Sequence, residues 1–67
     1  MKKYNVLRAV MKAKKCNIER LAEMTHCTVQ SVYNKLNGKT DWTLTEMLAI
    51  QAGLESTERL EILFYRG

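Results

Sequence analysis

Apolar residues recur every three or four positions along most of this chain, which is the spacing that predicts amphipathic helices. The first such stripe, within residues 3–14, consists of Tyr4, Leu7, Val10 and Met11. Shorter runs with the same period follow over residues 17–24 and 28–37. The chain has no proline and only three glycines, which fall at predicted helix ends or at the terminus. An all-α fold is therefore predicted.

Residues with side-chain oxygens mark where several of these helices begin. Asn17 and Thr28 are placed to cap the second and third helices, and residues 43–46 (Thr-Leu-Thr-Glu) have the spacing of a capping box. Gly38 is expected to supply the left-handed residue that ends the third helix. His26, in the turn before that helix, is expected to adopt the same backbone conformation.

Two further helices are predicted in the second half of the chain. The fourth has its apolar positions at Leu44, Met47, Leu48 and Ile50. The fifth is expected to be capped by Ser56 or Thr57, with an apolar stripe of Leu60, Leu63 and Phe64. Five helices of about 8–12 residues with short loops result, and residues 1–67 are expected to form one domain.

Residues 18–38 have the pattern of two short helices joined by a tight turn. The apolar set expected to hold this pair together is Leu21, Ala22, Cys27, Val32 and Leu36. The same spacing turns outward Val29, Gln30, Tyr33, Asn34 and Asn37. Short polar groups on a rigid helix are suited to the edges of bases in a major groove, so the pattern predicts sequence-specific binding of double-stranded DNA.

The distribution of charge agrees with a polyanionic partner. Residues 1–40 carry nine basic and two acidic side chains, a net +7, whereas residues 41–67 carry two basic and five acidic ones, a net −3. The overall charge is +4. The predicted DNA-reading helix thus lies in the positive half of the chain, although lysines on a helix also occur simply as a solvated face.

These residues resemble a known family. The run from Ile18 to Gly38 and the following residues 39–46 are similar to the small phage repressor and Cro-type proteins of the lambda-repressor-like (XRE-type) helix-turn-helix superfamily. The resemblance spans roughly residues 4–64. It implies a compact five-helix DNA-binding domain with the helix-turn-helix at its second and third helices, acting as a transcriptional repressor of phage or mobile-element type. Two departures are Ile18, where glutamine is common, and His26, where glycine is common.

The resemblance also implies which residues touch DNA. The positions that contact bases in the family are occupied here by Val29, Gln30 and Asn34, with Tyr33 as a possible fourth. The positions expected to contact phosphate are Thr28, Asn37, Lys39, Thr40 and Lys35. The chemistry agrees, because amides can read adenine with a donor and an acceptor while valine can contact a thymine methyl. For Tyr33, stacking, a phosphate contact and a place in the core all remain open.

The cysteine and histidine residues give only weak indications of a metal site or a catalytic site. Cys16, His26 and Cys27 match no common zinc module, and no third group is evident to orient a Cys-His nucleophile. We therefore expect no metal, no cofactor and no enzymatic activity. The two thiols are expected to be reduced, and Trp42 is expected to fill the apolar gap beside the third helix.

The chain shows neither a signal peptide nor an apolar run long enough to span a membrane, which favours a cytoplasmic protein. No small-molecule ligand is expected. Ile62 and Tyr65, together with Leu54, are expected to be exposed near the C-terminus, which suggests a homodimer formed through the fifth helix. The alternative function is a protein-interaction module, an antirepressor or modulator on the same fold, which Ile18 and Val29 would favour by placing apolar groups where polar DNA contacts are common.

Overall fold

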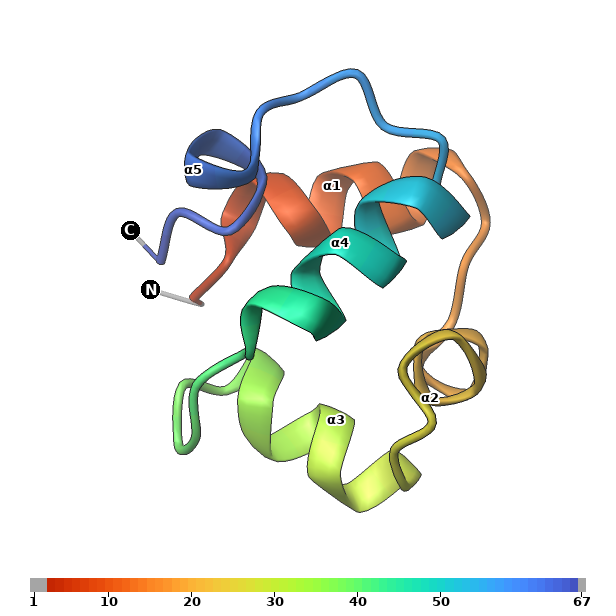
Figure 1. The fold of residues 1–67 in the computed structure, drawn as a ribbon, viewed down its shortest axis with the longest axis vertical. Coiled ribbons are helices and arrows are strands. Elements are labelled where there is room, and N and C mark those ends of the chain that lie inside the picture. The colour runs from red at the N-terminus through yellow and green to blue at the C-terminus, as the bar shows by residue number, and fades with distance from the viewer. Residues whose placement is uncertain (1–2, 67) are drawn as a thin grey trace.

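The computed structural model describes residues 3–66, and these residues form five helices. The helices are α1 (Asn5–Ala13), α2 (Ile18–Thr25), α3 (Val29–Leu36), α4 (Leu44–Gly53) and α5 (Leu60–Leu63). No strand occurs among the described residues, so the predicted all-α, five-helix fold is confirmed. Figure 1 shows α4 in the middle of the molecule, between α1 and α5 on one side and the α2–α3 pair on the other. None of the described helices combines the length and apolar character that crossing a bilayer requires.

Three helices begin with the side-chain caps that the sequence predicts. The Asn17 carboxamide oxygen accepts the backbone N–H of Arg20 at 2.9 Å, and the Thr28 hydroxyl accepts that of Ser31 at 3.1 Å. At the start of α4, Thr43 and Glu46 each accept the other's backbone N–H, at 3.2 and 2.9 Å. The two N-caps and the capping box are thus confirmed, and each satisfies an amide that the first helical turn leaves without a partner.

Helices α1 to α4 are followed by residues in the left-handed backbone region. His26 (φ 57°) follows α2 and Gly38 (φ 80°) follows α3, as predicted. Lys15 (φ 55°) and Glu55 (φ 51°) take the same conformation after α1 and α4. Since only glycine adopts this region without a steric cost, three of these four helix ends carry local strain.

The core joins α1 and the C-terminal segment to the helix-turn-helix. Its fully buried side chains include Leu7 from α1, Leu21 from α2, Val32 from α3 and Ile50 from α4. Trp42 is 7% exposed, and its ring meets that of Phe64 edge to face, with the centroids 5.8 Å apart. The predicted structural role of Trp42 is therefore confirmed.

The prediction for the last helix was wrong in its start and its length. α5 has only four residues, and its N-cap, Arg59, makes no side-chain capping bond. Ser56 instead accepts the backbone N–H of Glu58 at 3.1 Å, so its hydroxyl stabilises a local turn over residues 56–58, before the helix begins at Leu60. The side chain of a capping residue can accept a backbone N–H in a turn as readily as at the start of a helix. The sequence pattern does not distinguish the two cases.

Burial departs from the apolar pattern at three leucines. Leu54 is buried at 3% exposure, contrary to the expectation that it faces solvent. Leu44 and Leu48, two of the apolar positions of α4, are 60% and 47% exposed. In the predicted exposed pair near the C-terminus, Ile62 and Tyr65 are 44% and 65% exposed, so that expectation is confirmed.

Candidate nucleic-acid interface

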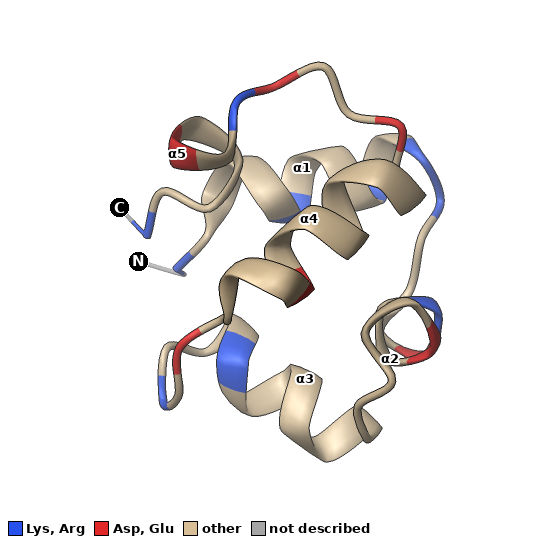
Figure 2. Ribbon diagram, in the orientation of Figure 1, with Lys and Arg blue, Asp and Glu red and all other residues tan. Residues whose placement is uncertain are grey.

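Helix α3 has one face in the core and one in solvent. Val32 and Leu36 point inward and are 0% and 2% exposed. The opposite side carries four residues, which we call the outer face of α3: Val29, Gln30, Tyr33 and Asn34. Val29 and Tyr33 are 46% and 51% exposed, which excludes the core position considered for Tyr33. This outer face contains no charged side chain, as Figure 2 shows along the N-terminal part of α3.

Two amides on the outer face are already joined to each other. Gln30 donates from Nε2 to the Asn34 Oδ1 at 3.2 Å, across one turn of the helix. Gln30 Oε1 and Asn34 Nδ2 make no hydrogen bond within the described chain. The pair therefore presents both an acceptor and donors to whatever approaches the helix, which is the combination that the edges of base pairs recognise in the major groove.

The turn before α3 sets the angle between α2 and α3. Cys27 donates its backbone N–H to the carbonyl of Ala22 at 3.0 Å, directly after the left-handed His26. Thr28 then begins α3 and uses its hydroxyl oxygen as the cap, so the hydroxyl proton stays available to a further acceptor. The backbone N–H groups of the first turn of α3 add a positive partial charge beside it.

The far end of α3 is held by an arginine from α1. The Arg8 guanidinium donates to the carbonyl of Leu36 at 2.9 Å and to the Asn37 Oδ1 at 3.4 Å, while its Nε donates to the carbonyl of Lys3. Asn37 therefore directs its carbonyl oxygen toward Arg8. Its Nδ2 group remains as a donor at the exposed end of the helix.

A second arginine, from the C-terminal segment, holds the loop that follows. Arg66 donates to the carbonyl of Gly38 at 2.9 Å and to the Asp41 carboxylate at 3.1 Å. Lys39 and Thr40 lie between these two anchors and are exposed. None of the salt bridges among the described residues involves Lys39, so its charge is available to a ligand.

Lys35 points away from the other candidate DNA-binding residues. Its ammonium forms an ion pair with Glu46 and lies 5.6 Å from the centre of the Trp42 ring. The Cys27 thiol donates to the same Glu46 oxygen at 3.1 Å. These contacts join the C-terminal half of α3 to the start of α4, with the Lys35 and Glu46 side chains only 12% and 13% exposed.

The ion pair shifts the titration of both partners. Burial alone would raise the pKa of Glu46, but hydrogen bonds from Lys35, from the Thr43 backbone and from Cys27 outweigh it and lower this pKa to about 2. Burial likewise works to lower the pKa of Lys35, yet the contacts with Glu46 and Cys27 leave it raised. Both groups therefore stay charged at neutral pH, and the pair fixes α3 relative to α4.

Sequence reasoning missed the two arginine anchors and the second role of Glu46. Arg8 is 28 residues from Leu36, and Arg66 is 28 residues from Gly38, so no local spacing connects them. Glu46 was assigned only to the capping box, although its other oxygen binds Lys35. The partner of Lys35 lies eleven residues away in another helix and only becomes adjacent once α3 and α4 pack.

The residues weighed as a zinc site, Cys16, His26 and Cys27, are not brought together as one in the described part of the chain. No group of three or more histidine, cysteine, aspartate or glutamate side chains in residues 3–66 is arranged to hold a metal ion. Both cysteines are free thiols. Ile18, which departs from the common glutamine, packs partly buried against the core and so fills a structural position.

Comparison with known proteins agrees with this geometry. The family model of the Cro/C1-type HTH DNA-binding domain matches residues 6–55, which include α2, α3 with its outer face, α4, and all of α1 except its first residue. No curated protein and no solved structure matches the chain. Because the family match covers most of the sequence, the chain belongs to the Cro/C1-type helix-turn-helix family of DNA-binding domains.

Proposed function

We propose that this member of the Cro/C1-type family is a cytoplasmic, sequence-specific regulator of transcription that inserts α3 into the major groove of double-stranded DNA. The observation that carries the proposal is the outer face of α3, where an uncharged, hydrogen-bonded pair of amides lies between anchored helix ends. An ordinary solvated helix face needs no such fixed arrangement of donors and acceptors.

Base reading is assigned to the outer face of α3. Gln30 and Asn34 supply donors and acceptors, which suit adenine and also allow guanine or cytosine contacts. Val29 offers only methyl groups and is assigned to a thymine methyl. Tyr33, half exposed beside them, is assigned a stacking or phosphate contact at the edge of the groove.

Phosphate contacts are assigned to both ends of α3. Thr28 provides a hydroxyl at the N-terminal end, and Asn37 provides Nδ2 at the C-terminal end. Lys39 and Thr40 extend this contact along the loop. The ion pair with Glu46 supports a positioning role for Lys35, because a direct phosphate contact would require the ammonium to leave its carboxylate.

The biological role we propose is repression of phage or mobile-element type, in which the bound protein occludes a promoter. Residues 1–67 are taken as one DNA-binding domain. We further propose that two copies bind a two-fold symmetric operator through an interface at α5, with half-sites about 34–36 Å apart. The exposed Ile62 and Tyr65 support this interface.

The experiment that tests the proposal is selection from a random duplex library at moderate salt. The wild type and a Gln30→Ala/Asn34→Ala double variant are compared, with Gln51→Ala as a control that removes an amide from α4. We expect the wild type and the control to enrich the same two-fold motif and the double variant to lose or alter it. Failure of the folded wild type to enrich any motif would contradict the proposal.

A protein-interaction module is the second candidate function. The exposed Leu44 and Leu48 on α4 favour it, since they add apolar surface that DNA reading does not use. Salt dependence separates the two functions. DNA binding weakens steeply as salt rises because counterions are released, whereas an apolar protein interface is much less sensitive.

A further inference from the structure

The segment that precedes α1 lies against the residues at the end of α3. The Lys3 carbonyl accepts a hydrogen bond from Arg8 Nε at 2.8 Å, and the same arginine donates to the Leu36 carbonyl at 2.9 Å. The next residue, Tyr4, donates its backbone N–H to the carbonyl of Arg66 at 3.3 Å. Lys3 is therefore held between the end of α3 and the C-terminal segment, and Figure 1 shows both ends of the described chain on this side of the molecule.

Gly38 leaves the space that the Lys3 side chain fills. A Cβ atom on Gly38 would lie 2.3 Å from Lys3 Cδ, 2.8 Å from its Cε and 2.9 Å from an Arg66 guanidinium nitrogen. Non-bonded atoms do not approach so closely, so a larger residue at position 38 would displace both side chains. The methylenes of Lys3 thus cross the backbone directly after α3, and the ammonium, one bond beyond Cε, stays in solvent beside it.

The surroundings of the Lys3 ammonium are positive. Arg8, Lys39 and Arg66 lie around the same helix end, and Figure 2 shows basic residues at both ends of the described chain and in the loop after α3. The nearby carboxylate of Asp41 is already bound by Arg66 at 3.1 Å. None of the salt bridges among residues 3–66 involves Lys3, so its charge is available to a ligand.

The C-terminal end of a helix normally repels an anion, because its last carbonyl groups carry partial negative charge. Two arginines cover those groups at the end of α3. Arg8 donates to the carbonyl of Leu36, and Arg66 donates to that of Gly38 at 2.9 Å. Between them, Asn37 accepts from Arg8 with its Oδ1 and keeps Nδ2 as a donor. This end of α3 is therefore suited to bind an anion.

We infer that Lys3 completes a phosphate-binding site at the end of α3, in which its ammonium and Asn37 Nδ2 bind the same phosphate of the DNA backbone. When the outer face of α3 lies in the groove, the end of the helix meets the strand that borders the groove. Lys39 then reaches the neighbouring phosphate along the loop. The inference rests on the proposed function and deepens it, because it adds to the DNA interface a cation from outside the helix-turn-helix.

The first test is the salt dependence of DNA binding by Lys3→Met. This variant keeps an unbranched side chain against Gly38 and removes the charge, so its melting temperature should equal that of the wild type. We expect it to bind the selected operator and an unrelated duplex about fivefold more weakly than the wild type does. The slope of log K against log salt should become shallower by about one unit for each bound copy.

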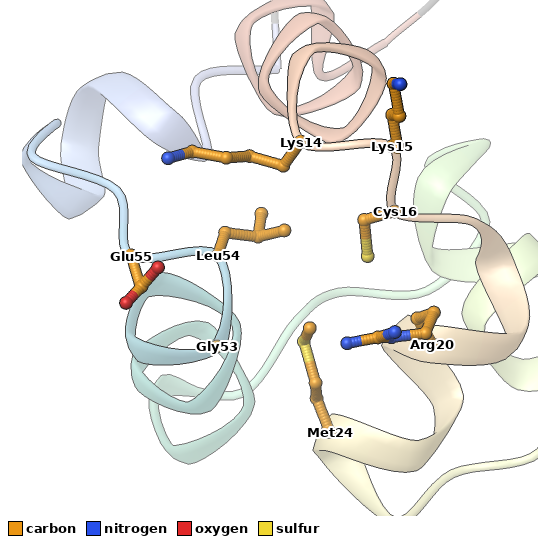
Figure 3. A pocket seen from close by; sticks show the side chains of 8 residues that line it. All are labelled: Lys14, Lys15, Cys16, Arg20, Met24, Gly53, Leu54 and Glu55. Atoms are coloured by element: carbon orange, nitrogen blue, oxygen red, sulfur yellow. The ribbon is translucent and has the colours of Figure 1, made fainter.

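Lys14→Met is the matched control, because it removes one lysine at the opposite end of α1. In Figure 3, Lys14 lies near Leu54 and Glu55, at the edge of a cavity whose lining includes no residue of α3. We expect this variant to bind DNA with the affinity and the salt slope of the wild type. Equal losses for Lys3→Met and Lys14→Met would overturn the inference, because they would reflect net charge alone.

The second test locates the phosphate. Phosphates of the operator are replaced one at a time by an uncharged methylphosphonate, and the affinities of the wild type, Lys3→Met, Asn37→Ala and Lys14→Met are measured. We expect one position at which the wild type and Lys14→Met lose affinity while Lys3→Met and Asn37→Ala lose clearly less, because each already lacks a contact to that phosphate. Reduced sensitivity of the two variants at different positions would overturn the shared phosphate.

Failure of the inference can be told apart from failure of the proposed function. If the wild type binds its operator and Lys3→Met has the same affinity, salt slope and methylphosphonate profile, Lys3 is a solvated lysine and the proposed function stands. If the folded wild type binds no duplex, the DNA-binding function is contradicted and the phosphate site is overturned with it.

Discussion

The amide pair on α3 leads to a prediction about how single residues share the reading of DNA. Gln30→Ala or Asn34→Ala is expected to cost about 1–3 kcal/mol of operator binding and to relax specificity at one base position. Because Gln30 donates to Asn34 across 3.2 Å, the double variant should lose less than the two single losses together. Binding isotherms on a matched set of operators measure all four proteins.

Strictly additive losses would contradict the coupled pair while leaving base contacts in place. Wild-type affinity of Asn34→Ala for its best operator would exclude a reading role for Asn34. Gln51→Ala serves as the control, since its amide donates to the Glu58 carbonyl on another part of the molecule.

Lys39 is expected to act through charge alone. It is exposed and forms no salt bridge in the described part of the chain, so Lys39→Gln should weaken binding to all DNA sequences alike. The slope of log K against log salt should become shallower by about one unit. Lys12→Gln on α1 is the control that also removes one positive charge. A change in the preferred base at any position would contradict a pure phosphate contact.

At the scale of the helices, the stability that the contact between α3 and α4 contributes to the fold should depend on pH. The pKa of Glu46 is lowered from 4.5 to about 2 in the folded chain. The unfolded chain therefore binds more protons between these values, so the stability from this carboxylate is complete above about pH 4.5 and is lost as pH falls toward 2. The contribution is on the order of 3 kcal/mol, since the side chain is only 13% exposed.

Denaturant unfolding followed by far-UV circular dichroism from pH 2 to 7 measures this dependence. Glu46→Gln should be less stable at pH 7, because Lys35 loses its partner, and should lack this part of the acid dependence. Glu61→Gln is the matched control, since Glu61 pairs with Arg59 at an exposed surface, where such a pair contributes little. If the free energy of unfolding depends on pH in the same way for the wild type and Glu46→Gln, the ion pair is not the cause of the acid dependence.

A glycine substitution in the turn between α2 and α3 should increase the stability of the fold. His26 has φ 57°, a conformation that glycine adopts without the steric cost that other residues incur. His26→Gly is thus expected to stabilise the fold by about 1 kcal/mol, raising Tm by about 4–8 °C in a domain of this size. His26→Ala, which keeps a Cβ, is expected to give no such gain in a thermal melt. A lower Tm for the glycine variant would show that the imidazole makes a compensating contribution.

Local signals predicted the helices well wherever the relevant contact spans few residues. The caps at Asn17 and Thr28 act three residues away, and His26 and Gly38 take the backbone that their helix ends require. α5 was mispredicted because Ser56 caps a turn instead of a helix. The outer face of α3 followed from helical periodicity, and its exposure agrees.

Contacts between distant segments could not be predicted in the same way. Arg8 and Arg66 donate hydrogen bonds to backbone carbonyls at the end of α3 and just after it. These contacts depend on how α1 and the C-terminal segment pack. An arginine with several possible carbonyl partners carries no sequence signal for any one of them.

The whole molecule exposes two apolar surfaces, one with Ile62 and Tyr65 at its C-terminal end and one with Leu44 and Leu48 on α4. The two surfaces predict different assemblies. If α5 forms the dimer, Ile62→Ser/Tyr65→Ser should be monomeric in sedimentation equilibrium with operator present, and should bind a single half-site. Leu44→Ser/Leu48→Ser, with a similar loss of apolar surface on α4, should assemble like the wild type. The reverse result would move the interface to α4, and monomers throughout would contradict a homodimer.

Trp42 gives the molecule an optical reporter in a useful place. It is the only tryptophan in the chain, is 7% exposed, and lies between the Phe64 ring and the Lys35 ammonium. Its fluorescence should therefore change with solvent exposure of the core and with any movement of the Lys35 cation. Unfolding and docking of α3 can both be followed by intrinsic emission, without attaching a dye to the surface that binds DNA.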